Sequence, residues 1–140
     1  IPVQSEYYAL EGLTLLLNTI KMIKSRLNSK LEIEGYLLTM FDSRLRLSNQ
    51  VAQEMEKYFQ DKLFSVKVMR NVKISESPSY GKPVVVYDPL SMGAKNYTEL
   101  ANEFLKRNNM EQHQRFDNIL TYEAPKFEEL DESKKDIPAT

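Results

Sequence analysis

The fold class is decided by residues 31–41, LEIEGYLLTMF. The stretch begins by alternating apolar and polar residues, and from Tyr36 onward it is apolar except for Thr39. A short apolar run of this kind is typical of a strand that is covered on both faces, as in a parallel sheet. We therefore expect a buried strand here, with helices on either side of it in the sequence.

Before and after this strand in the sequence, apolar residues recur at helical spacing. They predict three helices, over residues 6–27, 47–60 and about 92–107. Their expected core positions are Leu13, Leu16, Ile20, Ile23 and Leu27; Val51, Met55, Tyr58 and Phe59; and Ala94, Tyr97, Ala101 and Phe104. Strands are expected at residues 1–3, at the alternating Phe64, Val66 and Val68, and at residues 84–87. The alternation predicts an α/β domain with three or four mainly parallel strands.

The composition is that of an ordinary globular protein, and the net charge does not by itself indicate a nucleic-acid or membrane partner. It has 140 residues, a net charge of -1 and no cysteine, which excludes disulfides and thiolate metal sites. No apolar run approaches the ~20 residues of a membrane span. The start, Ile1-Pro2-Val3-Gln4, has neither a signal-peptide pattern nor a methionine, so we expect the chain to be cut from something longer. Any DNA binding must come from a local basic patch.

Catalytic patterns are sparse. The four glycines, Gly12, Gly35, Gly81 and Gly93, do not form the G-x-x-x-x-G-K-[ST] loop that closes backbone amides around phosphate. We therefore expect no ATP hydrolysis by this chain alone and assign no catalytic residue and no metal ligand. His113 is expected to be an exposed surface residue, and the acidic residues 128–132 to be a solvated tail.

Basic residues follow two of the expected strands. Arg44 and Arg46 follow the strand ending at Phe41, and residues 70–73, Arg-Asn-Val-Lys, follow the strand at 64–68. The carboxyl ends of parallel strands face the ligand crevice, so these cations could meet nucleotide or DNA phosphates. On pattern alone, solvated arginines with Arg44 paired to Asp42, and an Asn71 that bonds its own turn, are favoured instead.

Several stretches together resemble one family, the ParA/Soj partition ATPases. The resemblance spans about residues 1–106 and rests on segments in family order: residues 1–4 (IPVQ), 6–13 (EYYALEGL), 34–44 with Leu37–Asp42 and Arg44, 47–51 (LSNQV), 70–83 (RNVKISESPSYGKP), 87–89 (YDP) and 93–94 (GA). It implies a partial P-loop NTPase-like fold of the deviant-Walker kind, a mainly parallel sheet with flanking helices. The missing phosphate loop belongs to the N-terminal half of such proteins.

The resemblance also implies partners and site residues. Full-length members bind ATP with magnesium, form homodimers, bind DNA non-specifically and respond to a ParB-type centromere-binding protein, which would place this protein in the bacterial cytoplasm at the nucleoid. By position, Arg44 and Lys73 match DNA-binding residues, with lysine replacing the usual arginine at residue 73. Met40, Met69, Arg70 and Asn71 match the region around the adenine base. No nucleotide is expected on the fragment itself.

The sequence therefore predicts three regions. Residues 1–107 form the C-terminal half of a ParA-type ATPase domain, 108–123 an extra helix, and 124–140 a flexible polar tail. Two alternatives stay open: a truncated stand-alone regulatory module without nucleotide hydrolysis, and a cobyrinate-amidase or nitrogenase-reductase relative, the latter disfavoured by the lack of cysteine. Because half of a parallel sheet exposes an unpaired edge, we expect the chain alone to form a dimer or a higher assembly.

Overall fold

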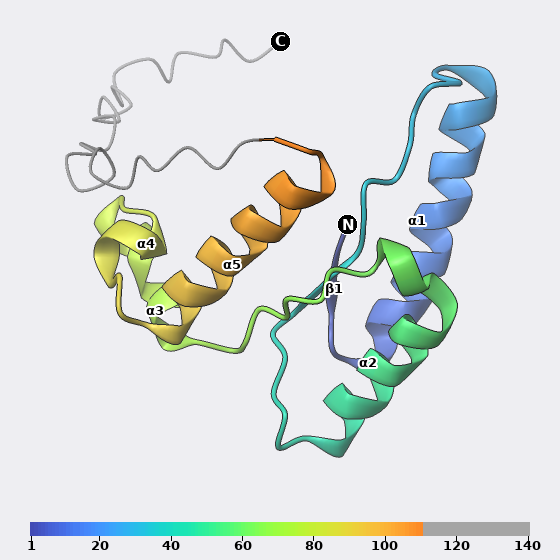
Figure 1. Ribbon diagram of the computed structural model, residues 1–140. Helices are drawn as coiled ribbons and strands as arrows, with labels where there is room; N and C mark the ends of the chain where they lie inside the picture. Colours follow the sequence, from blue (N-terminus) through green and yellow to red (C-terminus); the bar gives the residue numbers. More distant parts are fainter. Residues whose placement is uncertain (111–140) are drawn as a thin grey trace, which may run out of the picture.

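The computed structural model describes residues 1–110, in which two short strands alternate with helices. The elements are β1 Pro2–Gln4, α1 Tyr7–Arg26, β2 Leu37–Thr39, α2 Arg46–Phe59, the 3-10 turn η1 Gln60–Lys62, α3 Val72–Glu76, the 3-10 turn η2 Ser77–Tyr80, α4 Val84–Tyr87 and α5 Met92–Arg107. Helices α1 and α2 lie on one side of the strands, and α3, α4 and α5 lie on the other (Figure 1). The described part is thus a partial α/β fold. The helix expected at 108–123 and the tail at 124–140 fall outside it from residue 111 onward.

The two strands are parallel, as the apolar run predicts. Val3 of β1 lies opposite Leu38 of β2. A third extended segment, residues 63–69, runs along the side of β2 that faces away from β1. Two isolated parallel bridges join it to the chain around β2, one from Tyr36 to Leu63 and one from Phe41 to Met69. The expected three or four strands are therefore two strands and one bridged segment, and the strand expected over 31–41 is limited to Leu37–Thr39.

The alternating segment at 64–68 pairs with β2 at its ends but not in its middle. Phe64 N donates to Tyr36 O at 2.8 Å, and Val68 N donates to Leu38 O at 2.9 Å. Between them, the Ser65 and Val66 amides donate instead to the Glu103 carboxylate of α5, at 2.9 and 3.0 Å. A side chain from a distant helix thus replaces the strand hydrogen bonds.

The strand expected at residues 84–87 is wrong, because these residues form helix α4. Pro83 precedes them with φ -66°, and its carbonyl accepts from the Val86 and Tyr87 amides. Asp88 N then donates to Val84 O at 2.9 Å and closes the turn. A four-residue apolar run has no period that separates strand from helix, and packing of α4 beside α5 decides the outcome.

The core lies between the strands, α1 and α2. Its buried residues are Val3, Leu13, Tyr36, Leu38, Phe41, Val51, Ala52, Met55 and Leu63. Leu38 and Met55 expose no surface, and burying each side chain contributes about 1.5–3 kcal/mol. Six expected core residues are exposed instead: Leu16, Leu27, Tyr58, Tyr97, Ala101 and Phe104.

Gly35 lets the chain pass close to its neighbours just before β2. A Cβ atom at this position would lie 2.7 Å from Phe64 Cε2 and 2.9 Å from the Lys62 carbonyl. Only glycine fits this approach, which brings Tyr36 within hydrogen-bonding reach of Lys62 O at 2.8 Å. The bridged segment is thereby held against β2.

Candidate functional site

The ends of β2 and of segment 63–69 lie side by side, as expected for parallel neighbours. Phe41 N donates to Val68 O, and Arg70 N donates to Phe41 O, both at 3.0 Å. Met40 adopts a left-handed backbone with φ 53°, which turns the chain at the end of β2. Met40, Met69 and Arg70, all predicted near a nucleotide base, are thus brought to adjoining strand ends.

Two shallow hollows flank these strand ends. The larger, about 310 Å³, is lined by Met40, Asp42 and Arg70 and by residues 5–8, which connect β1 to α1 and form the start of α1. The second, about 250 Å³, is lined by Asp42, Arg44, Met69, Arg70 and Met92 among others. Asp42 and Arg70 border both hollows. One cation and one carboxylate therefore sit between two openings of a size that fits part of a nucleotide.

The Asn71 side chain hydrogen-bonds to the backbone of the turn in which it lies. Its Oδ1 accepts from Lys73 N at 2.9 Å and caps the N-terminus of α3. This is the turn interaction favoured from the sequence, and it leaves the side-chain NH2 as the group available to a ligand.

Arg44 is a highly exposed member of the predicted site. Its side chain is 86% exposed, while that of Asp42 is 14% exposed. The Arg44 Nε and Nη2 atoms donate to the two Asp42 carboxylate oxygens at 2.9 and 2.6 Å, and Arg44 N donates to Asp42 Oδ1 at 3.1 Å. These hydrogen bonds lower the pKa of Asp42 to about 2. The expected pairing is present as a bidentate fork.

Lys73 also faces a carboxylate. Its Nζ donates to Glu76 Oε2 at 2.9 Å, and that same oxygen accepts from the Tyr87 hydroxyl at 3.1 Å. Tyr87 lies on α4, and its ring stacks on Tyr80 with the centroids 4.9 Å apart. The hydrogen bond and charge of Glu76 raise the pKa of Lys73. Sequence reasoning missed Glu76 and Tyr87, although the i,i+3 spacing of Lys73 and Glu76 on a helix would have signalled that pair.

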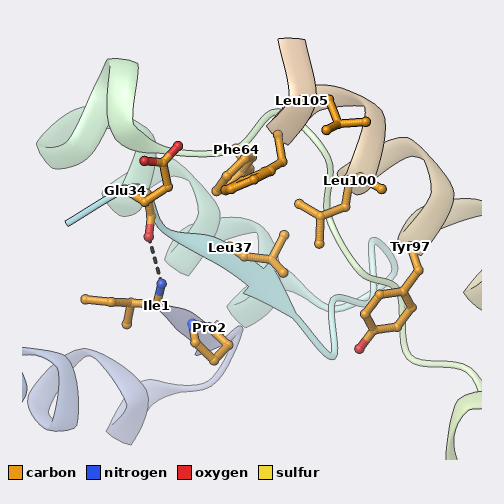
Figure 2. A pocket seen from close by; sticks show the side chains of 11 residues that line it. Ile1, Pro2, Glu34, Leu37, Phe64, Tyr97, Leu100 and Leu105 are labelled. Atoms are coloured by element: carbon orange, nitrogen blue, oxygen red, sulfur yellow. Dashed lines mark hydrogen bonds between the residues drawn. The ribbon is translucent and has the colours of Figure 1, made fainter. Parts of the chain in front are cut away.

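A larger cavity lies elsewhere and is lined almost wholly by apolar residues. This groove, of about 620 Å³, lies between α5 and the strands. Figure 2 shows Tyr97, Leu100 and Leu105 of α5 lining one wall, with Leu37, Ile1 and Pro2 lining the other. Glu34 is the one charged side chain among its lining residues, so the groove suits packing against apolar surface rather than phosphate binding.

Among residues 1–110, no cluster of three or more histidine, aspartate or glutamate side chains is arranged to hold a metal ion. Within the same residues, no helix is both long and apolar enough to cross a membrane. His113 and the acidic residues 128–132 lie outside the described residues.

Comparison with known proteins assigns the family. Residues 4–84 match the CobQ/CobB/MinD/ParA nucleotide binding domain. The Bacillus subtilis sporulation initiation inhibitor protein Soj is 55% identical over 103 residues, which are 74% of this chain and 41% of the relative. The chain belongs to the ParA/Soj family of chromosome-partitioning ATPases. The resemblance read from the sequence is confirmed.

Other ParA/Soj relatives agree. The Myxococcus xanthus chromosome partitioning protein ParA is 51% identical over 107 residues, 76% of this chain and 38% of the relative. The Treponema pallidum chromosome-partitioning ATPase Soj is 49% identical over 107 residues, 76% of this chain and 42% of the relative. The chain thus spans about two fifths of the length of the ParA/Soj proteins it matches.

Proposed function

We propose that this chain is the C-terminal part of a ParA-type ATPase that partitions chromosome or plasmid DNA. It contributes one wall of the adenine pocket and a DNA-facing surface, while the rest of such a protein supplies the phosphate loop and the magnesium ligands. Membership of the ParA/Soj family supports this role, as do the missing glycine-rich loop and the match to only part of each relative. Homodimerisation, a ParB-type partner and a cytoplasmic, nucleoid-associated location belong to the same proposal.

One observation carries the nucleotide half of the proposal: Met40 and Met69 lie at adjoining strand ends beside open hollows. A purine base has flat, largely apolar faces, and methionine is a soft, adaptable side chain that packs well on aromatic rings. Met40 is 40% exposed, so its thioether is available to a base. ATP binding by these residues would need phosphate contacts from a separate glycine-rich loop.

Exposed cations at the same edge support the DNA half. Arg44 and Arg70 are exposed beside the hollow that they share with Met92, and Lys73 lies in the first turn of α3, after the neighbouring strand end. Guanidinium and ammonium groups bind phosphate without reading sequence, which suits non-specific DNA. Each phosphate contact steepens the salt dependence of binding by roughly one unit of log–log slope.

A chimera tests both halves of the proposal. Residues 1–107 replace the aligned segment of the Treponema pallidum ATPase, and ATP hydrolysis and DNA binding are measured. We expect Met40→Asn, which tolerates the left-handed backbone, to raise the KM for ATP about tenfold, because an apolar wall of about 1–2 kcal/mol is lost. Arg44→Ala should weaken DNA binding and flatten its salt slope. Met22→Asn and Arg26→Ala, exposed on α1, are the matched controls.

The chimera can also contradict each half separately. An unchanged KM for ATP in the Met40→Asn chimera would remove Met40 from the adenine pocket. Equal DNA affinity and equal salt slope for the Arg44→Ala and Arg26→Ala chimeras would remove Arg44 from the DNA surface. A chimera that folds but shows no ATP hydrolysis would favour the stand-alone module.

A further inference from the structure

Both cations assigned to the DNA surface are engaged by carboxylates of this same chain. Arg44 is paired with Asp42, and Lys73 is paired with Glu76. Among residues 1–110, by contrast, the structure records no ion pair for Arg70, the third cation at this edge. The question is what these two carboxylates do to phosphate binding.

The Asp42 fork occupies the edge of Arg44 that phosphate would use. A guanidinium binds a planar or tetrahedral oxyanion best through two parallel N–H donors, and Nε with Nη2 is one such pair. Both atoms already donate to Asp42, so a phosphate must displace the carboxylate or use the remaining donors. Asp42 is itself held by Arg44 N and is only 14% exposed, so it does not swing away freely.

Glu76 is likewise held in place. Its Oε2 accepts from both Lys73 Nζ and the Tyr87 hydroxyl, and Tyr87 is stacked on Tyr80. Lys73 Nζ lies 5.7 Å from the centroid of the Tyr87 ring. Lys73 therefore has a carboxylate on one side and an aromatic face on another. It retains two N–H donors, but its charge is largely neutralised by a fixed neighbour.

We propose that Asp42 and Glu76 are positioning residues that restrain Arg44 and Lys73 and so keep the intrinsic affinity for DNA phosphate low. This inference rests on the proposed DNA-binding role. Each carboxylate orients its cation, and an arriving phosphate either displaces the carboxylate or uses the N–H donors that remain. A negative charge also stays within a few ångströms of the bound phosphate and opposes it at low salt. Weak intrinsic binding would leave the contact dependent on a further partner or subunit.

Conservative variants separate charge from local structure. Asp42→Asn keeps an oxygen that can accept from Arg44 N, and Glu76→Gln keeps an oxygen that can accept from the Tyr87 hydroxyl. Each removes one negative charge and releases one cation. Glu32→Gln is the matched control, because it releases Lys24 from a comparable 3.1 Å ion pair in the loop before β2, at the opposite end of that strand.

The experiment measures binding of a short, mixed-sequence DNA duplex to the 140-residue chain by fluorescence anisotropy over a salt series. Exposed ion pairs are weak, so Asp42→Asn and Glu76→Gln should each tighten binding only about two- to fivefold at low salt. Their salt slopes should steepen by up to about one unit, because each freed cation releases a counterion. Glu32→Gln should change the affinity less than twofold and leave the slope unchanged.

The outcomes distinguish this inference from the function on which it rests. If Arg44→Ala and Lys73→Ala leave DNA affinity and slope unchanged, the DNA role itself is wrong. If these alanine variants weaken binding but Asp42→Asn and Glu76→Gln bind no tighter than wild type, only the restraint is wrong. Equal tightening by Glu32→Gln would show a general charge effect and would also overturn the restraint.

Discussion

The ion pair of Asp42 and Arg44 forms within one turn of backbone, so its geometry is set locally. Asp42 lies just beyond the end of β2. Its carboxylate accepts hydrogen bonds from both the backbone N–H and the guanidinium of Arg44. Because Arg44 is 86% exposed, solvent screens the pair and its role in stability is small. Its consequence is electrostatic: it sets the charge that the exposed edge presents.

Arg44→Ala should raise the pKa of Asp42 from about 2 part of the way toward its ordinary 3.8, because the two side-chain hydrogen bonds to the carboxylate are lost while the backbone N–H of residue 44 still donates to it. A folded-state pKa below the unfolded value means that the pair stabilises the fold above about pH 4 and loses this effect as the pH falls toward 2. A carboxyl 13C NMR titration measures both midpoints. A midpoint that stays near 2 in Arg44→Ala would assign the shift to another group.

Residue positions were predictable where they depend on strand order, and not where they depend on tertiary partners. Arg44 and Met69 follow expected strands and Met40 lies near the end of one, and parallel neighbours bring these ends together whatever the exact pairing. The Lys73–Glu76–Tyr87 contacts depend on α4, whose helical state the apolar run does not reveal. Predicting their hydrogen bonds required knowing that Pro83 starts a helix there.

Helix α5 and the segment beside β2 are joined by one carboxylate. Glu103 accepts from the Ser65 and Val66 amides and from the Ser65 hydroxyl at 2.7 Å, and it also accepts from Arg107 at 2.6 Å. Arg107 in turn donates to Leu63 O at 2.6 Å. Burial alone would raise the pKa of Glu103, but the hydrogen bonds outweigh it and lower the pKa. Glu103 therefore accepts the amide hydrogen bonds that a neighbouring strand would otherwise accept.

Glu103→Gln should destabilise the fold by about 2 kcal/mol, because one carboxylate oxygen becomes an NH2 group facing backbone N–H donors. Urea unfolding followed by circular dichroism measures this loss. Glu99→Gln, on an exposed position of the same helix, is the matched control and should stay within about 0.5 kcal/mol of wild type. Equal midpoints for the two variants would show that α5 is held to the segment by apolar packing alone.

The same interaction explains why the sheet is smaller than the sequence indicates. Phe64, Val66 and Val68 alternate as a strand should, yet the amides between the paired ends turn to Glu103, which lies 38 residues from Ser65. An alternating apolar pattern indicates which side chains are buried, but it does not indicate which acceptor the backbone N–H groups bond to. The three long helices were predictable within a residue or two, because each repeats its apolar spacing over several turns.

Within residues 1–110, large apolar side chains are exposed on both sides of the small sheet. On one side, Leu15, Leu16 and Met22 of α1 are 70%, 41% and 49% exposed. On the other, the groove beside α5 is open, with Tyr97 and Phe104 partly exposed in its wall. Among residues 1–110, the outer side of β1 pairs with no strand. Unpaired backbone groups and apolar surface together favour association with another polypeptide.

We therefore expect the 140-residue chain to associate in a concentration-dependent way, measured by static light scattering. Phe104→Asp should shift it toward monomer, because burying a carboxylate in a groove lined almost wholly by apolar side chains is costly. Leu90→Asp, at a position 84% exposed and away from the groove lining, is the matched control and should associate as wild type does. If the two aspartate variants associate equally, the contact runs through α1 or the β1 edge. If wild type remains a monomer at high concentration, the uncovered surfaces are too dispersed to hold a partner of the same sequence.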